Sequence, residues 1–317
     1  MTKSWTATVV LAVASLGCQD GTSGAGSTPD TGAPPSDPGG PADTPVQDTA
    51  APDTDAGGTP DVDPFYGAGS MVQILEMVSS QGTTGGIGAE FMDAERPSSE
   101  KLVATEGPCR YYQAAPNGFC DPGCGSSDYC GPDNACHPWP QRVSAGKIAI
   151  DGLTMPMTLT PDPSAWYALD GAAPSDLFAP GAAIHVTAAG AAVPAFTADV
   201  HGVADMTLTT GDTVALHAGQ TTEVAWPVAK DGARVELVLQ LGWHGAPPAD
   251  IIWCDVDEAD GHVTIPVAFA DKFPKVPEIG LFQHPSMIRR VSRAFVNGPS
   301  GPIEVRVASE RGVQVTK

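Results

Sequence analysis

The sequence predicts an all-β protein: an antiparallel β-sandwich, built as one large or two small β units, with a disulfide-rich loop and a disordered N-terminal tether. Three observations predict this class. Short β-rich runs recur between residues 71 and 309, glycine-containing turn pairs separate them, and almost no segment shows the apolar stripe of a helix. With 36 glycines and 31 prolines among 317 residues, long helices are not expected.

The first 17 residues have the three parts of a secretory signal peptide. Lys3 supplies the positive charge, an apolar stretch runs from Trp5 to Leu16, and small residues precede Cys18. About twelve apolar residues are too few to span a bilayer. We therefore expect residues 1–17 to be removed from the mature protein.

The segment Ser15-Leu16-Gly17-Cys18 resembles the cleavage box of bacterial lipoproteins, although Ser15 stands where that family usually has Leu. In the family, the chain is cut before the cysteine, whose thiol and new amino group are then acylated. The resemblance implies a lipid on Cys18. It also implies the outer membrane, on a face left open, because Gln19 replaces the Asp that retains many lipoproteins at the inner membrane. The alternative is ordinary signal cleavage that leaves Cys18 as a free thiol or removes it.

Residues 18–64 are expected to form a disordered linker between the lipid and the folded region, residues 65–317. From Gln19 to Pro64 there are nine Asp, nine Pro and eight Gly, with no Glu, Lys or Arg. Such a segment cannot bury enough apolar surface to offset the entropy of ordering it. As a flexible coil it reaches about 40 Å, which would hold a domain clear of a membrane.

Six cysteines follow the linker, and in an exported chain an even number predicts disulfides. They are Cys109, Cys120, Cys124, Cys130, Cys136 and Cys254. Four of them fall within residues 120–136, part of a Cys-rich segment (109–136) that is too poor in aliphatic residues to form a core of its own. Of fifteen connectivities, we predict Cys120–Cys130, Cys124–Cys136 and Cys109–Cys254. The alternative, a zinc site, lacks the paired C-x2-C spacing of common zinc modules.

Nine segments are predicted as strands, and the chain turns between them. The strands are 71–78, 86–94, 146–152, 182–190, 222–228, 233–243, 250–256, 262–269 and 302–309, with a short helical turn at 267–273. The turn pairs are 151–152, 189–190, 231–232, 260–261 and 297–298. In 303–307, apolar side chains alternate with Glu304 and Arg306, as expected of a sheet with one wet face.

The folded region resembles a group of uncharacterised exported proteins of myxobacteria and related predatory bacteria. The matching segments are GPCRYYQ (107–113), CDPGCGSSDYC (120–130), HPWPQRVSAGKIAIDGL (137–153), the stretch 166–196 and IIWCDVDEADGHVTIP (251–266). The resemblance spans roughly residues 107–307. It implies a recurrent exported β module, and it brings no assigned activity and no catalytic residues.

Charge and motifs exclude several functions. Against 37 acidic residues stand 16 basic ones, and the net charge of -21 repels nucleic acid. The chain has no nucleophile elbow, P-loop or dinucleotide fingerprint, and its seven histidines form no local metal-binding pair. We therefore predict no catalytic residue and no cofactor, and an enzyme is disfavoured.

Asp255, Asp257 and Asp260 are the candidate metal ligands, because three nearby carboxylates could bind calcium. An EF-hand loop counted from Asp255 would need Gly at its sixth position and Glu at its twelfth, where this chain has Asp260 and Pro266. We expect a hairpin that turns at Asp260-Gly261 with solvated carboxylates, and no metal. A lone calcium site is the alternative.

Five tryptophans follow the linker. Trp226 and Trp253 lie in predicted strands, where burial is the usual fate of such large side chains. Trp139, Trp166 and Trp243 lie in predicted loops and are candidates for an exposed binding rim.

Together these features predict a lipid-anchored protein of the cell envelope, held to the membrane by its lipid, that binds another protein or a glycan. Two alternatives stay open: a metal-dependent or hydrolytic exported enzyme, and a purely structural envelope component.

Overall fold

A computed structural model describes residues 69–98, 100–114, 120–131, 133–169, 173–242, 248–275 and 286–317. The chain divides into two units, Met1–Asp55 and Ala56–Lys317, and all described residues belong to the second. The predicted signal peptide, Cys18 and the whole predicted linker lie outside the described residues. No helix of the described part is long and apolar enough to cross a membrane.

The centre of the fold is one long, mixed sheet of ten strands. In spatial order they are β3 (Glu100–Glu106), β4 (Cys109–Ala114), β15 (Pro248–Asp257), β14 (Arg234–Gly242), β17 (Ser286–Gly298), β18 (Gly301–Thr316), β1 (Ser70–Ser79), β2 (Gly82–Glu90) and β9 (Tyr167–Ala168), with β12 (Thr213–Ala215) pairing with β18. Neighbours are antiparallel, except that β1 and β12 run parallel to β18. Both exceptions join strands far apart in the sequence, where no tight hairpin imposes an antiparallel direction.

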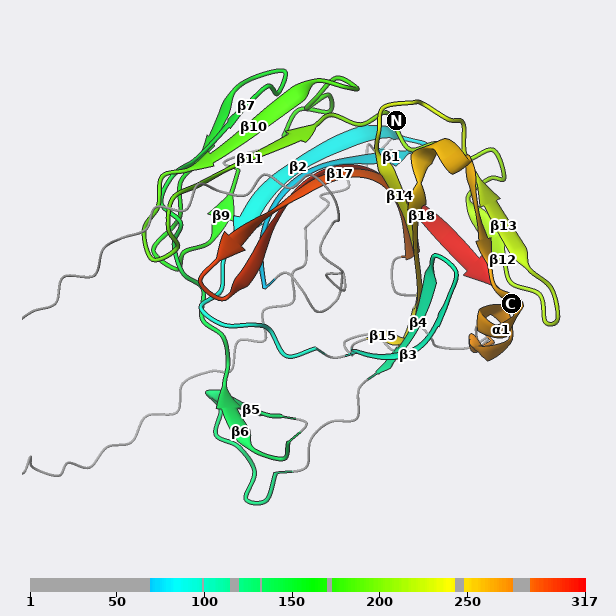
Figure 1. The fold of residues 1–317 in the computed structure, drawn as a ribbon, viewed down its shortest axis with the longest axis horizontal. Coiled ribbons are helices and arrows are strands. Elements are labelled where there is room, and N and C mark those ends of the chain that lie inside the picture. The colour runs from blue at the N-terminus through cyan, green and yellow to red at the C-terminus, as the bar shows by residue number, and fades with distance from the viewer. Residues whose placement is uncertain are drawn as a thin grey trace, which may run out of the picture. The chain divides into compact units, whose positions relative to one another are not determined.

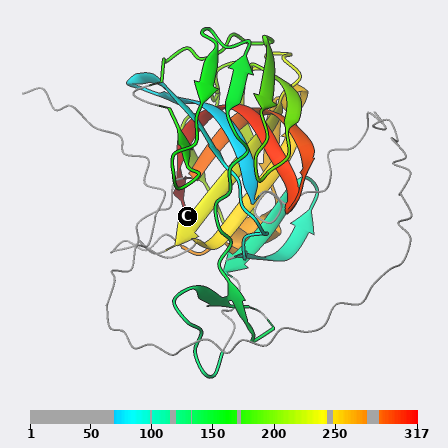
Figure 2. The same ribbon diagram turned by 90° about the vertical axis from the view of Figure 1, so that its left-hand side faces the viewer.

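Smaller elements lie beside this sheet. A four-stranded sheet has the order β11 (Phe196–His201), β10 (Ala183–Ala188), β7 (Ile148–Asp151) and β8 (Met157–Leu159). Two pairs complete the strands: β13 (Thr222–Ala225) with β16 (His262–Ile265), and β5 (Asp128–Cys130) with β6 (Cys136–Pro138). The helices are short: η1 (Glu258–Asp260) and α1 (Val267–Lys272). The β5–β6 pair is set apart from the larger sheets in both Figure 1 and Figure 2.

Two apolar cores lie on the same face of the long sheet. Ile303, Val305 and Val307 of β18 belong to the core shared with the four-stranded sheet. Val313 and Val315, further along the same strand, belong to a second core shared with β13, β16 and α1. Because all five positions are odd, they share one face of the strand, which is the convex face of the curved sheet in Figure 1. The fold is thus a β-sandwich in which one long sheet supports two layers.

A short connection accounts for the strong curvature of the long sheet. β2 and β3 lie seven positions apart in the strand order, which is about 34 Å along a flat sheet. They are joined only by the chain from Glu90 to Glu100, which reaches about 35 Å when fully extended. A flat sheet would leave this connection no slack, whereas the curved sheet drawn in Figure 1 shortens the distance that it has to cover.

All nine predicted strand segments contain strands, and the helical turn is α1. The largest strand that the sequence pattern missed is β17, because arginines at 289, 290 and 293 hide its alternation. The predicted wet face was wrong: Glu304 is 8% exposed and the Arg306 side chain 13%. The second face of β18 is polar, but it is buried.

The three predicted disulfides are confirmed. Cys109–Cys254 joins directly opposed residues of β4 and β15 and closes a loop of 145 residues. Cys120–Cys130 and Cys124–Cys136 have separations of only 10 and 12 residues, and both lie around the β5–β6 pair.

Alanine at both Cys109 and Cys254 is expected to lower the free energy of unfolding of the sandwich by about 4 kcal/mol, because the long loop would regain its entropy in the unfolded chain. Alanine at both Cys120 and Cys130 is expected to leave the main unfolding transition near its wild-type midpoint. Urea denaturation of the two double variants makes the comparison. Equal losses would contradict a separate structural role for the β5–β6 pair.

Candidate functional site

The candidate site is the knob, which we define as residues 120–131 and 133–141, built around the β5–β6 pair. Tyr129 lies directly opposite His137, and Cys130 directly opposite Cys136. Side chains alternate along a strand, so the two cysteines share one face of the hairpin and the two rings share the other. The knob therefore has a covalent face and an aromatic face.

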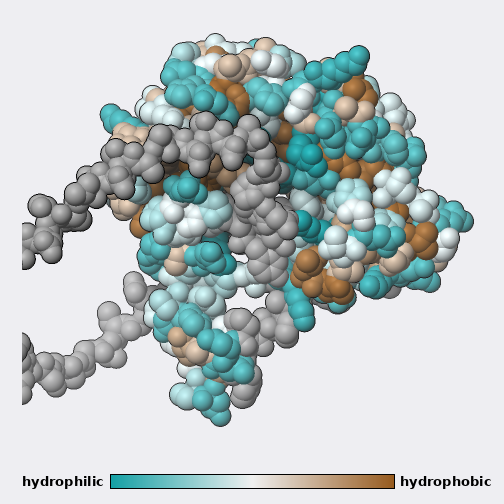
Figure 3. Space-filling view, viewed as in Figure 1, coloured by the Kyte–Doolittle hydropathy of each residue, from teal (hydrophilic) through white to brown (hydrophobic). Residues whose placement is uncertain are grey.

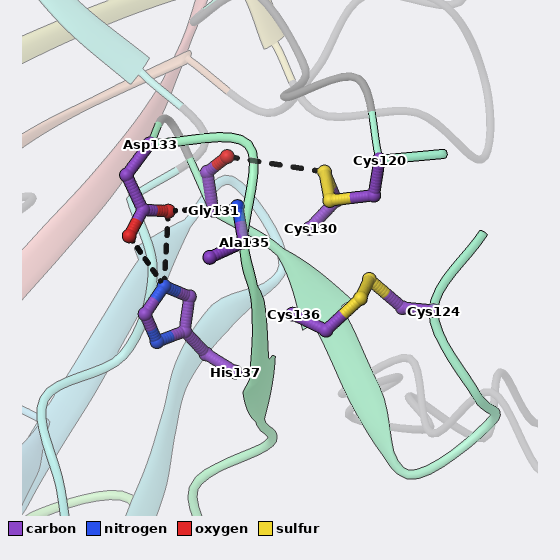
Figure 4. Close-up of a disulfide and its surroundings, with 8 residues drawn as sticks. All are labelled: Cys120, Cys124, Cys130, Gly131, Asp133, Ala135, Cys136 and His137. Carbon is purple, nitrogen blue, oxygen red and sulfur yellow. Dashed lines mark hydrogen bonds and ion pairs between the residues drawn. A yellow bond between two sulfur atoms is a disulfide. The ribbon is translucent and has the colours of Figure 1, made fainter. Parts of the chain in front are cut away.

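The covalent face carries both disulfides. Cys130 is bonded to Cys120, and Cys136 to Cys124 (Figure 4). The sulfurs of Cys120, Cys124 and Cys130 lie within 4.8 Å of one another, the only potential metal-ligand cluster in the described part of the chain. Each of these sulfurs is in a disulfide, whereas zinc binds thiolates. The arrangement is a pair of adjacent staples, and it does not support the zinc alternative.

The aromatic face holds three rings in contact. The ring centroid of Tyr129 lies 5.0 Å from that of Trp139 and 5.5 Å from that of His137. The Trp139 amide donates to the Ser127 carbonyl at 3.0 Å, which continues the ladder beyond β6. Trp139 is 47% exposed, and no other tryptophan of the described residues is exposed to this extent.

A hydrogen-bonded aspartate–histidine pair lies at one end of the aromatic face. Both carboxylate oxygens of Asp133 lie 3.0 Å from His137 Nε2 (Figure 4). The hydrogen bond from His137, with one from the Ala135 amide, holds the pKa of Asp133 below its usual range. Gly131 makes room for this pair, since a Cβ there would come within 2.6 Å of Asp133 Oδ1. In the sequence, the signal of this pair is Gly131 directly after Cys130. The strand pattern alone does not show why a glycine is needed there.

The base of the knob is tied to the long sheet's β2 end. The Gln141 amide donates to Asp93 Oδ1 at 2.8 Å, and the Asp93 amide donates to the Gln141 carbonyl at 3.0 Å. The Val143 amide donates to the Phe91 carbonyl at 2.9 Å. These bonds fix the chain that follows Trp139, while the disulfides fix the hairpin that precedes it. The aromatic face is therefore held on both sides.

The other predicted rim tryptophans have different fates. Trp166 is half-buried beneath the guanidinium of Arg142, whose carbon lies 4.9 Å from the ring centroid. Arg142 is in turn bonded to Glu90 at 2.6 Å. Trp243 lies outside the described residues. Of the two predicted rim tryptophans that the structure describes, Trp139 is the exposed one.

Trp226 and Trp253 are buried, as predicted, at 3% and 5% exposure. Trp226 Nε1 donates to the Glu258 carbonyl. Trp253 lies on the concave face of the long sheet with Tyr112, Val238 and Ile251. Neither ring is available to a sugar platform.

The concave face also carries a ladder of buried ion pairs. Glu236 accepts hydrogen bonds from Arg289 Nε and from Arg293, each at 2.5 Å. Asp255 accepts from Arg234 Nε at 2.5 Å and is also bonded by Arg293. The Glu236 side chain is 2% exposed. Sequence reasoning missed this ladder because its members come from three strands whose register was unknown.

The pKa values of this ladder reflect competition between burial and charge. Burial alone would raise the pKa of Glu236, but Arg289 and Arg293 outweigh it and hold the pKa below its usual range. For Glu310 of β18, which lies opposite Arg289 beside the ladder, burial raises the pKa, and Arg289 and Arg306 offset this only in part. The ladder depends on its arginines, and we interpret it as support for the sheet, because its charged groups are already paired with one another.

The candidate calcium ligands do not form a site. Asp255 is ion-paired on the concave face, and Asp257 accepts the Ala259 amide as the cap of η1. Asp260-Gly261 does form the expected turn, with Gly261 at φ 69°. The expected hairpin was wrong, because β15 pairs with β14 and β4 whereas β16 pairs with β13. The expected solvation of Asp255 was also wrong, since its side chain is 12% exposed.

One serine–histidine pair has the spacing that nucleophilic catalysis would need. The Ser292 hydroxyl lies 2.9 Å from His201 Nδ1. That hydroxyl also accepts a hydrogen bond from the His201 amide at 3.0 Å. Ser292 of β17 is 6% exposed where it meets His201 of β11. A nucleophile has to reach its substrate, so this pair is better explained as a tie between two sheets.

Comparison with known proteins gives no relative from which a function could be transferred. No known family model and no curated protein matches the chain. Among solved structures, the crystal structure of chicken CNTN1 FN1-FN3 domains is similar over 69% of this chain and 67% of that chain, at 10% identity and a TM-score of 0.15. The fold of this chain is therefore defined by its own strand pairing.

Replacing Glu236 by Gln is expected to lower the free energy of unfolding by about 3 kcal/mol at pH 7, because the buried Arg289 loses its hydrogen-bonded anion and Arg293 keeps only Asp255. The pKa of Glu236 is lower in the folded protein than in the unfolded chain. The stabilisation from its ion pairs is therefore fully present above the unfolded-state pKa, and it is lost as the pH falls through the folded-state pKa. The difference between wild type and variant should shrink in acid.

The matched control is Glu223→Gln, at an exposed position of β13, which should leave the unfolding midpoint unchanged. Denaturant titrations of both variants at neutral and acid pH supply the measurement. A Glu236→Gln protein as stable as wild type at pH 7 would refute a stabilising role for the ladder.

Proposed function

We propose that the protein is an exported, lipid-anchored module of the outer membrane that recognises a ligand through the aromatic face of its knob. Cys18 carries the lipid, and residues 19–64 form the tether. The β-sandwich then presents the knob to a protein or a glycan. No catalytic residue is assigned.

The exposed ring of Trp139 carries this proposal. A tryptophan usually contributes its large apolar area to a core or an interface, and leaving half of it in water forgoes that stabilisation. Here the ring is exposed on a segment with few other apolar side chains, so the sandwich itself gains little from it. A purely structural component gives no reason for such a residue, whereas a binding surface does.

The rigidity of the aromatic face supports the same function. Two disulfides, the β5–β6 ladder and the bonds to Asp93 hold the hairpin, and Tyr129 packs against Trp139. A ligand therefore would not have to order these side chains, and that entropy would not be subtracted from its binding energy. The face drawn in Figure 3 is mostly hydrophilic, and its apolar patches are small and separate. That face therefore does not favour recognition through an extended hydrophobic interface.

Replacing Cys18 by Ser is expected to abolish lipid attachment and move the protein from the membrane fraction to the soluble fraction. The residue that the lipid would modify is then absent, and the remaining chain keeps its fold. Metabolic labelling with a fatty acid and fractionation of the producing cells provide the test. Labelled, membrane-bound Cys18→Ser protein would contradict the anchor.

Replacing Trp139 by Ala is expected to weaken binding to envelope fragments from the producing cells by about tenfold or more, which corresponds to roughly 1.4 kcal/mol. Met155→Ala is the control, because Met155 is also an exposed apolar residue, at 54%, but lies outside the knob. Sedimentation of the purified mature protein with the fragments measures the affinities. Equal binding by wild type and Trp139→Ala would rule out the knob as the recognition surface.

A further inference from the structure

Resting on the proposed function, we propose that the ligand of the knob is a neutral oligosaccharide, with one pyranose ring stacked on Trp139. The sugar's hydroxyl groups would bond to Asp133 and His137 at the end of the aromatic face. This inference names the chemical class of the ligand, which the proposed function leaves open between protein and glycan.

The shape of the aromatic face fits a sugar ring. One side of a pyranose presents C–H groups that pack on an aromatic face, and Trp139 offers the largest such face, backed by Tyr129 at 5.0 Å. Pro138 and Pro140 flank Trp139, and their fixed φ angles limit how far the backbone can turn the ring. The ring is thus held open to the solvent.

The polar groups beside the rings fit hydroxyl groups. The Asp133 side chain is 56% exposed and is held ionised by its bond to His137, so its oxygens can accept further hydrogen bonds. Within the described part of the chain, the hydrogen bonds of the His137 ring go through Nε2 to Asp133, which leaves Nδ1 for a ligand. A carboxylate and an imidazole nitrogen next to an aromatic ring supply hydroxyl partners at the edge of a stacked sugar.

The charge of the knob indicates that the sugar is neutral. Residues 120–141 contain three acidic residues, Asp121, Asp128 and Asp133, and no Lys or Arg. The nearest arginine along the chain, Arg142, is bonded to Glu90 and stacked on Trp166. In a chain of net charge -21, this surface repels sulfated, phosphorylated and uronate-rich glycans.

The small apolar area of the knob argues against a protein ligand. Stable protein interfaces bury roughly 800 Å² on each partner around an apolar centre. Tyr129, Trp139 and Ala135 are the apolar residues of the β5–β6 hairpin and its turn that are neither Pro, Gly nor a bridged Cys. Such a surface fits one or two sugar rings better than a folded partner.

The test uses the purified mature protein and three neutral hexasaccharides: cellohexaose, maltohexaose and hexa-N-acetylchitohexaose, with dextran sulfate as the anionic comparison. Titration calorimetry should detect binding of at least one hexasaccharide and none of dextran sulfate. Trp139→Ala should weaken that binding about tenfold or more, Trp139→Phe should weaken it less, and Met155→Ala should not change it. Asp133→Asn should weaken binding while the ring contacts persist.

Disulfide mass mapping of each variant shows whether both staples of the knob have formed, and Trp139→Phe keeps the test valid if the alanine variant does not fold. Binding of none of the hexasaccharides, binding of dextran sulfate alone, or hexasaccharide binding that Trp139→Ala leaves intact would each overturn the inference.

The failures of the two proposals are distinguishable. If Trp139→Ala loses binding to envelope fragments and protease treatment of the fragments also removes it, the ligand is a protein. The proposed function then stands and the sugar inference falls. If Trp139→Ala binds the fragments as well as wild type does, the proposed function falls too.

Discussion

The alternation of side chains along the β17–β18 hairpin is the constraint on which the rest of the sandwich depends. The odd positions of β18 supply both apolar cores, first beneath the four-stranded sheet and then beneath β13, β16 and α1. The opposite face of the same hairpin supplies Arg289 and Arg293, which bind Glu236 of the neighbouring strand. A slip of one residue in this pairing would exchange the two faces, placing arginines in the cores and valines in the ion-pair ladder.

The same period of two, on a much smaller scale, builds the knob. In the β5–β6 pair, cysteines occupy one face and rings the other, so disulfides replace the core that this segment is too short and too polar to form. Because the disulfides on one face stabilise the hairpin, the side chains on the other face do not have to pack into a core. That is why a tryptophan can be rigid and yet exposed here, and why the knob, and not the concave face with its paired charges, is the better candidate for recognition.

Much of the fold was predictable from the sequence because burial follows the strand period, as in residues 303–307, and because six cysteines, four of them in a segment without a core, predict disulfides. The missed parts have physical reasons. β17 reads as a polar segment because Arg289 and Arg293 face a buried ladder and Arg290 pairs with the buried Glu258 on the other face. Glu304 and Arg306 were assigned to water although they are buried. Trp139 was selected as a rim residue from its place in a predicted loop, but its contact with Tyr129 depends on the register of a hairpin closed by disulfides, which spacing alone does not give. The pairing of β15 and β16 with strands of different sheets, decided by the tertiary fold, overrode the local signal of the Asp260-Gly261 turn.

The central claim is that the aromatic face of the knob is occupied by a ligand in the native envelope. Hydroxyl-radical footprinting of the protein in intact cells and after purification tests it most directly, because it reports the accessibility of individual side chains. The account predicts that oxidation of Trp139 and Tyr129 is lower in cells than in the purified protein, while oxidation of the exposed Met155 is the same in both. Equal oxidation of Trp139 in the two preparations would contradict the account.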